Sequence, residues 1–282
     1  MQTKWTEVRA GHIRAIRPRS RSESRAEQVI QQSTTSPWFL RFPQDPACRT
    51  RLVCFPHAGG AASYYVPYAR ALSPEVDVLA VQYPGRQNRY SEAHIEDIGT
   101  LADEIAAALE PWLDLPTALF GHSMGAVLAF EVTRRLERRG DFDAARLFVS
   151  GCPAPSRRRE ETFRKLDGDL DDNGVIAELR ALSGTNAAVF ENEELLRLTL
   201  PTIRSDYTAV RNYRAEPGAA VRAPVTVLAG DSDHRTTPDE LQAWQTHTTA
   251  TCDVHTFTGG HFFINDHAGE IVGLITDRLL TV

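Results

Sequence analysis

The sequence has few cysteines and no long hydrophobic run, and each shortage excludes a class of protein. Its four cysteines are widely spaced and include no C-x-x-C pair, which argues against a disulfide framework and against a zinc site. No apolar stretch approaches the ~18 residues that a membrane helix requires. No cluster of metal-ligating residues is visible either. We therefore expect a cytoplasmic protein with reduced thiols, without metal, cofactor or membrane contact.

The main part of the chain has more acidic than basic residues. Residues 1–36 hold seven Lys/Arg and three Glu, a net +4, so residues 37–282 carry −10 within a chain of net charge −6. An acidic body argues against nucleic acid as a partner. The first 36 residues are rich in Arg and Ser and have no apolar core of a secretion signal, so we expect a disordered extension. A targeting peptide is the alternative, which the three glutamates disfavour.

Short β-branched apolar runs alternate with longer segments of helical periodicity. Residues 97–113 and 125–140 place apolar side chains at helical spacing, and the second segment ends in basic residues and a glycine, typical of a helix C-terminus. This alternation predicts an α/β fold with a mostly parallel sheet and helices on both faces. The expected strands are RLVCF (51–55), VDVLAVQ (76–82), TALFG (117–121), ARLFVS (145–150) and VTVLAG (225–230).

The alternation stops between residues 151 and 224. This stretch contains helical patterns and an acidic loop but no convincing strand before residue 225. Its length far exceeds that of a usual crossover, and long insertions are commonly lids or binding elements. We therefore expect one domain over residues 37–282 that carries a helical lid insertion at about 151–224.

The pentapeptide GHSMG, residues 121–125, follows an expected strand and precedes an expected helix. That context is the one in which G-x-S-x-G forms a nucleophile elbow, with a serine held exposed in a strained turn. We therefore predict that Ser123 is a catalytic nucleophile. His122 is not expected to be its base, because consecutive side chains diverge in a tight elbow.

The base should come from later in the chain, since the order in this type of site is serine, acid, histidine. His261 follows an expected last strand (252–257) and two glycines, a position at the carboxyl end of the sheet where ligands bind. We predict that it is the base. Asp231 and Asp233 both follow the strand 225–230, and spacing alone does not choose between them as the acid. The other aspartate is expected to cap the loop.

Attack by a serine on a carbonyl group gives an intermediate with a negatively charged oxygen, the oxyanion, which needs N–H donors to stabilise it. One candidate is the amide of Met124, directly after the nucleophile. The second is the amide of Ala58 in the glycine-containing loop CFPHAGGAASYY, residues 54–65. We interpret His57 in this loop as a stabilising rather than a catalytic residue.

Five motifs are distinctive in combination, namely LVCFPHAGGAASYY, VQYPGR, FGHSMGA, LPTIRSDYTAVRNY and GGHFF. Together they resemble those of one family, the type II thioesterases that accompany polyketide synthases and nonribosomal peptide synthetases. The resemblance covers about residues 37–282. It implies an α/β-hydrolase fold with a helical lid, and in the family's pattern the second aspartate is the acid, which selects Asp233.

The resemblance further implies hydrolysis of stalled or misprimed acyl groups from the phosphopantetheine arm of an acyl or peptidyl carrier protein. Carrier proteins are generally acidic, so Arg157, Arg158 and Arg159 are candidates for a local docking patch, although a charge run is usually a solvated face. A monomer is expected. The alternatives are a chain-releasing thioesterase or small-molecule esterase with the same triad and, more remotely, a binding protein that keeps the fold without the chemistry.

Overall fold

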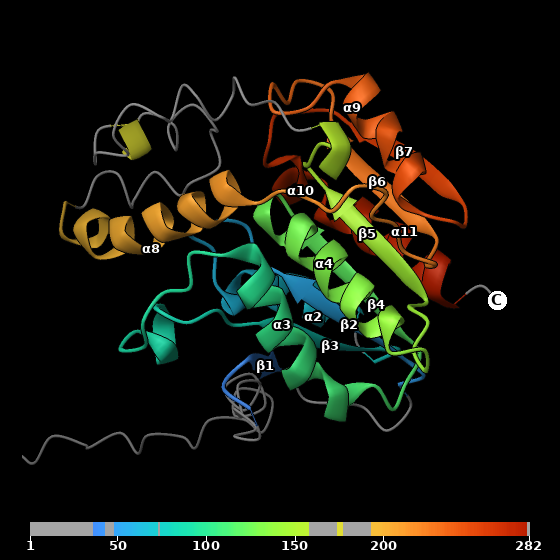
Figure 1. Ribbon diagram of the computed structural model, residues 1–282, viewed down its shortest axis with the longest axis horizontal. Coiled ribbons are helices and arrows are strands. Elements are labelled where there is room, and N and C mark those ends of the chain that lie inside the picture. The colour runs from blue at the N-terminus through green and yellow to red at the C-terminus, as the bar shows by residue number, and fades with distance from the viewer. Residues whose placement is uncertain (1–35, 43–47, 73, 158–173, 177–192, 281–282) are drawn as a thin grey trace, which may run out of the picture. The chain divides into compact units, whose positions relative to one another are not determined.

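The computed structural model describes residues 36–42, 48–72, 74–157, 174–176 and 193–280. Seven strands in this part of the chain form one sheet in the order β1-β3-β2-β4-β5-β6-β7 (Figure 1). All neighbouring strands are parallel except β1, which pairs antiparallel with β3. The strands are β1 (Phe39–Arg41), β2 (Thr50–Phe55), β3 (Val76–Val81), β4 (Thr117–His122), β5 (Arg146–Ser150), β6 (Val225–Gly230) and β7 (Cys252–Phe257).

The strand prediction is confirmed for six of these strands, and for all of them except the edge strand β7 the reason is burial on both faces. Every residue of β2, β3, β4 and β6 is buried, so these strands consist of nearly continuous apolar runs. Strand β1 is not among the predicted strands. It has three residues, too few to show any periodicity, and it exists through its pairing of Phe39 with Val81 at the sheet edge.

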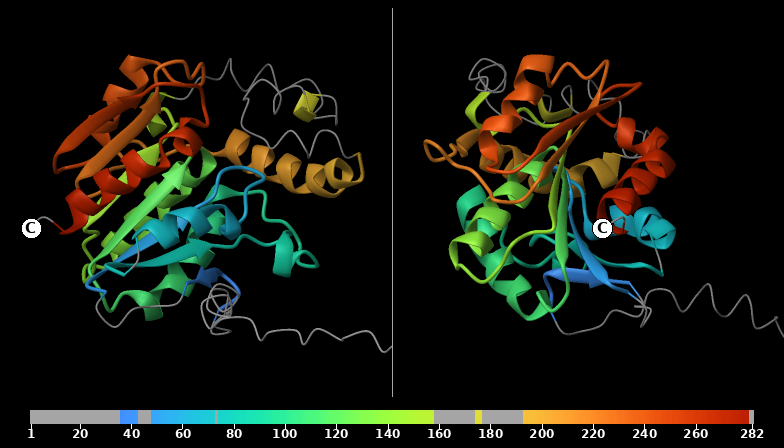
Figure 2. Two further views of the ribbon diagram at one scale, coloured as in Figure 1. Left: turned by 180° about the vertical axis from the view of Figure 1, so that it is seen from behind. Right: turned by 90° about the vertical axis from the view of Figure 1, so that its right-hand side faces the viewer.

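Helices cover both faces of the sheet, as predicted (Figure 2). One buried cluster packs α3, α4 and Trp244 of η5 against the first face, and a second packs α2, α10 and α11 against the other. The helices are α2 (Val66–Leu72), α3 (Ile98–Leu109), α4 (Met124–Arg138), α8 (Glu193–Asn212), α9 (Pro238–Gln242), α10 (Phe263–Asp266) and α11 (Ala268–Leu280). Short 3-10 turns are η1 (Ala62–Tyr65), η2 (Gln87–Arg89), η3 (Glu110–Trp112), η4 (Pro155–Arg157) and η5 (Ala243–His247).

The predicted insertion is described only in part. Its long helix α8 is present, and β6 resumes the sheet after it, whereas residues 158–173 and 177–192 lie outside the described residues. The predicted N-terminal extension, residues 1–36, lies outside them as well except for its last residue. No helix in the described ranges is both long and apolar enough to cross a membrane.

Candidate active site

Ser123 occupies a strained turn between β4 and α4. Its φ of 56° lies in the left-handed region that non-glycine residues rarely adopt, and its amide donates to the Ser150 carbonyl at 2.8 Å. Strain of this kind persists only where the surrounding structure enforces it, and it is concentrated at functional sites. The geometry is that of the predicted elbow, with the serine directly before the helix N-terminus.

Two glycines make this turn possible. A Cβ atom on Gly121 would lie 2.0 Å from the Gly125 carbonyl oxygen, and one on Gly125 would lie 2.0 Å from the Phe55 carbonyl oxygen. Both obstacles are backbone atoms, which cannot rotate away. Gly125 therefore lets the N-terminus of α4 contact the end of β2, where the loop with Ala58 begins.

His261 and Asp233 are joined by a buried hydrogen bond. His261 Nδ1 donates to Asp233 Oδ2 at 2.9 Å, with 4% and 0% of the two side chains exposed. The Arg235 amide donates to the other carboxylate oxygen at 2.9 Å. Because Nδ1 carries the proton in this arrangement, Nε2 is left as an acceptor, the form that a general base needs.

Asp231 has the other role considered for this pair of aspartates. It is exposed, and its Oδ1 accepts from the Gly259 amide at 3.0 Å, so it holds the loop that precedes His261. This hydrogen bond, followed by one from Ser232, keeps the pKa of the Asp231 carboxyl below its usual value. The geometry thus separates two aspartates that spacing could not separate.

His122 is hydrogen-bonded to the sheet and not to Ser123 in the described part of the chain. Its side chain is fully buried, and its Nδ1 lies 2.9 Å from the Ser150 hydroxyl on β5. Burial, with smaller contributions from His261 and His57, lowers the pKa of His122 well below its usual value. The ring is therefore neutral near pH 7, and its Nδ1 is occupied by the hydrogen bond to β5. Between the described residues no hydrogen bond joins the Ser123 and His261 side chains.

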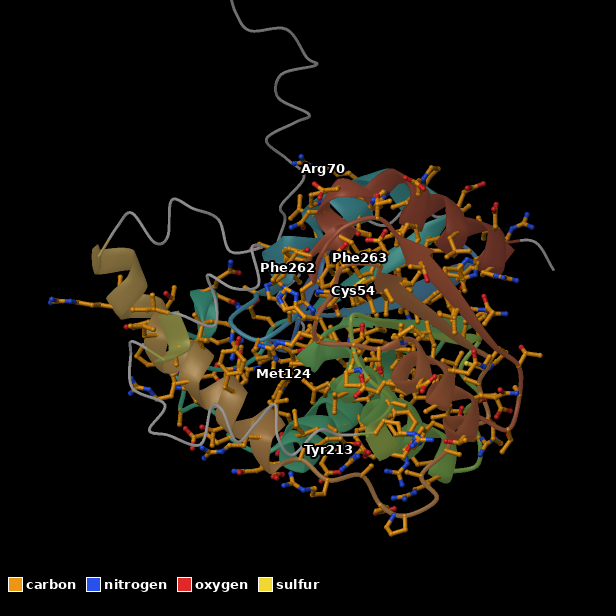
Figure 3. All side chains as sticks on the ribbon, turned by 90° about the horizontal axis from the view of Figure 1, so that it is seen from above. Cys54, Arg70, Met124, Tyr213, Phe262 and Phe263 are labelled. Atoms are coloured by element: carbon orange, nitrogen blue, oxygen red, sulfur yellow. The ribbon has the colours of Figure 1, made fainter. Side chains whose placement is uncertain are left out.

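His57 forms part of a cluster that the sequence did not indicate. Its ring contacts Tyr64 and Phe262, with centroids 4.8 and 4.9 Å away, and Phe262 also packs on His261 (Figure 3 labels Phe262). Burial, followed by the charges of His261 and Arg86, lowers the pKa of His57 to about 3. The packing agrees with the stabilising role predicted for it. Although histidines gather here, no group of His, Cys, Asp or Glu among the described residues could hold a metal ion.

The two predicted N–H donors lie on segments in contact with each other. Met124, which is labelled in Figure 3, is the first residue of α4. Its amide is therefore one of the first four of the helix, and these amides have no hydrogen-bond partner within the helix. Ala58 lies in the loop after β2, which Gly125 brings against α4. Backbone amides at a helix start and in an adjacent loop suit a developing negative charge.

Arg86 and Asp206 are two residues near the site that local sequence patterns did not single out. Both belong to motifs that carried the family resemblance, VQYPGR and LPTIRSDYTAVRNY, but they stand 120 residues apart, and no role was predicted for either. The structure joins them in a buried ion pair beside the Ala58 loop. Only the motifs themselves could have drawn attention to them.

The predicted arginine patch is described only at Arg157. This residue is exposed and lines a surface recess of about 470 Å³ together with Asp239 and Glu240, so its surroundings are of mixed charge. Arg158 and Arg159 lie outside the described residues. A docking role for the three arginines stays a prediction.

Comparisons with known proteins bear on this geometry. Residues 50–279 match the family described as the thioesterase domain. The chain is 44% identical to thioesterase PikA5 of Streptomyces venezuelae over 86% of this chain and 85% of that protein. It is 47% identical to the solved type II thioesterase BorB from the borrelidin biosynthetic cluster, with a TM-score of 0.79 and coverage of 86% and 97%. YbtT, a type II thioesterase from the yersiniabactin NRPS/PKS biosynthetic pathway, is 28% identical with a TM-score of 0.71, and the match covers 86% of this chain and 98% of YbtT.

Proposed function

Since the chain belongs to the thioesterase family and is a hydrolase acting on thioesters, we propose that it is an editing enzyme of the type II class. Its substrates would be unwanted acyl groups on the phosphopantetheine arm of acyl or peptidyl carrier proteins. The neighbours with the same α/β-hydrolase fold support this substrate class, because BorB and YbtT are type II thioesterases and YbtT belongs to an NRPS/PKS biosynthetic pathway.

The observation that carries the proposal is the buried 2.9 Å contact of His261 with Asp233 in a fold that also holds Ser123 in a strained elbow. In the first half-reaction His261 Nε2 takes the Ser123 hydroxyl proton while Oγ attacks the thioester carbonyl. Asp233 stays ionised, accepts the hydrogen bond from His261 Nδ1–H throughout, and stabilises the imidazolium that forms. The tetrahedral oxyanion is bound by the amides of Met124 and Ala58.

Collapse of this intermediate breaks the carbon–sulfur bond, and His261 gives its proton to the leaving thiolate. The carrier arm departs as a free thiol, and the acyl group stays on Ser123 as an ester. A water molecule then gives a proton to His261 and attacks the ester carbonyl. The second intermediate collapses to the free carboxylic acid, and Ser123 recovers its proton from His261.

Intact-mass spectrometry of acyl carrier proteins tests both the substrate and the residues. Acetyl-, propionyl- and longer acyl-carrier proteins are incubated with wild type, Ser123→Ala and His122→Ala. We expect wild type and His122→Ala to remove short acyl groups and Ser123→Ala to leave them in place. If carrier-bound groups survive while free thioesters or simple esters are cleaved, the proposed substrate is wrong. If only a full-length chain is released, the enzyme is a chain-releasing thioesterase.

A further inference from the structure

Arg86 and Asp206 form a buried, two-pronged ion pair between the loop after β3 and helix α8. The two guanidinium nitrogens Nη1 and Nη2 donate to Asp206 Oδ2 and Oδ1 at 2.7 and 2.8 Å. Only 7% and 2% of the two side chains are exposed. Parallel bonds of this kind fix the relative orientation of the two groups as well as their distance.

The same two side chains also bind the loop that follows β2, residues 56–61, which we call the oxyanion loop. Asp206 Oδ2 accepts from the Gly59 amide at 2.7 Å, and Arg86 Nη1 donates to the Gly60 carbonyl at 3.0 Å. One ion pair therefore makes hydrogen bonds to two consecutive residues of the loop.

Helix α8 also contacts this loop without polar groups. Gly59 has a φ of +75°, and a Cβ atom at this position would lie 2.7 Å from Ile203 Cγ1. Ile203 and Asp206 are three residues apart and so share one face of the helix. Packing and ion pair together leave the Gly59 backbone little freedom.

Further hydrogen bonds hold the first half of the loop. The Pro56 carbonyl accepts from the Tyr83 hydroxyl at 3.0 Å, and the His57 carbonyl accepts from the Gly60 amide at 2.9 Å. Between the described residues the Ala58 amide makes no hydrogen bond, so it is available to a ligand. This amide, adjacent to the bound Gly59, is the predicted oxyanion donor.

We propose that Arg86 and Asp206 are positioning residues that aim the Ala58 N–H at the oxyanion and thereby link helix α8 to the chemical step. The proposal rests on the proposed function, which assigns Ala58 as a donor. In the proposed mechanism neither the Arg86 nor the Asp206 side chain contacts the reacting atoms. They act through the backbone of Gly59 and Gly60, so their effect should fall on the transition state and not on the binding of substrate.

The test compares two matched substitutions, Asp206→Asn and Asp77→Asn. Asp77 pairs with Arg51 through Nε and Nη2 at 2.9 and 2.7 Å, and 1% of each of these two side chains is exposed. This second pair joins the beginnings of β2 and β3, at the opposite end of the strands from the site. Both variants lose a buried charge pair and keep the side-chain shape. Asp77→Asn therefore controls for loss of stability alone.

Three quantities are measured for each variant: kcat and KM on an acyl N-acetylcysteamine thioester, affinity for an acyl trifluoromethyl ketone, and urea unfolding. The ketone adds to a serine and places an oxyanion where the reaction forms one. Complete removal of one donor lowers kcat about 10²–10³-fold, so misaiming it in Asp206→Asn should lower kcat about 10- to 100-fold. Ketone affinity should fall by a similar factor while KM stays nearly constant. Asp77→Asn should shift unfolding without these losses.

The proposal is overturned if folded Asp206→Asn keeps its kcat and ketone affinity, or if Asp77→Asn loses as much of both. If Asp206→Asn does not fold, Arg86→Lys replaces it, since a lysine keeps the charge but not the paired geometry. The same selective loss of kcat is then expected, in smaller degree, and an unchanged kcat refutes the proposal.

The small thioester separates this inference from the proposed function. If carrier-bound substrates prove inert while the N-acetylcysteamine thioester is cleaved, the substrate assignment fails and the positioning effect is still measured. If Ser123→Ala is as active as wild type, the proposed mechanism fails and the inference fails with it.

Discussion

Replacing Gly125 with alanine should separate the nucleophile from one of its oxyanion donors. The added Cβ would lie 2.0 Å from the Phe55 carbonyl oxygen and 2.7 Å from that of Pro56. Ordinary contact at such atoms begins about 1 Å further out, and neither obstacle is a side chain that can change rotamer. The start of α4 must therefore move away from the oxyanion loop, or the loop from the helix.

Both stability and rate should respond. Forcing an extra carbon into a packed interior costs about 1–3 kcal/mol, which would appear as a lower free energy of unfolding in urea. A displacement of about 1 Å between reacting groups can lower the rate about 10²-fold, so kcat of Gly125→Ala should fall by that order. The donor loop is displaced relative to Ser123, while substrate binding elsewhere is untouched, so KM should change little.

The matched control is Gly273→Ala in the middle of α11. No atom lies within 4 Å of a Cβ built there, so the substitution is free of clash. It should raise the free energy of unfolding by about 1 kcal/mol, since alanine favours a helix interior over glycine, and leave kcat unchanged. A Gly125→Ala enzyme that folds and turns over like wild type would refute the reasoning from contact distances.

Three further outcomes follow from the described contacts. Asp233→Asn should lower kcat about 10⁴-fold in the same thioester assay, because an amide favours the wrong tautomer of the His261 imidazole. Asp231→Asn should keep most of the activity, because its amide oxygen can still accept from the Gly259 amide. The pKa of His57 is lowered to about 3, so the unfolded chain binds a proton below pH ~6.5 that the folded chain refuses. Stability should therefore fall with acidification from that pH, by up to about 1.4 kcal/mol per pH unit, and His57→Phe should flatten this slope in urea titrations between pH 7 and 4. Asp77→Ala should lower the free energy of unfolding by up to about 3–5 kcal/mol, because it removes the buried partner of Arg51 and leaves only the exposed Asp114 and the Trp112 carbonyl. An unchanged urea midpoint would contradict this.

Local patterns in the sequence predicted the sheet and the strained turn at Ser123. Strands such as β4 are buried on both faces, so their composition alone marks them, and the glycines of GHSMG record a backbone contact in the sequence itself. The edge strand β1 left no such mark because its existence depends on pairing with β3.

Contacts between distant segments were beyond reach from local patterns. Asp231 and Asp233 have nearly the same spacing to His261, and only the fold shows that Asp233 meets the ring while Asp231 meets the Gly259 amide. The resemblance to a family selected Asp233 as the acid without giving this reason. The pairing of Arg86 with Asp206 likewise depends on where α8 lies, which no periodicity encodes.

The carboxyl ends of β6 and β7 are joined by several close backbone contacts. The Asp231 amide donates to the Phe257 carbonyl at 2.8 Å, the Ser232 amide donates to that of Gly259 at 3.0 Å, and a Cβ on Gly230 would lie 2.4 Å from the Gly259 oxygen. Asp233 and His261 therefore lie on one contiguous segment, from β6 through α10, whose two strand ends are joined by backbone hydrogen bonds. Because these bonds depend on the backbone and on the missing Cβ of Gly230, related sequences that keep this glycine can vary the neighbouring side chains without separating Asp233 from His261.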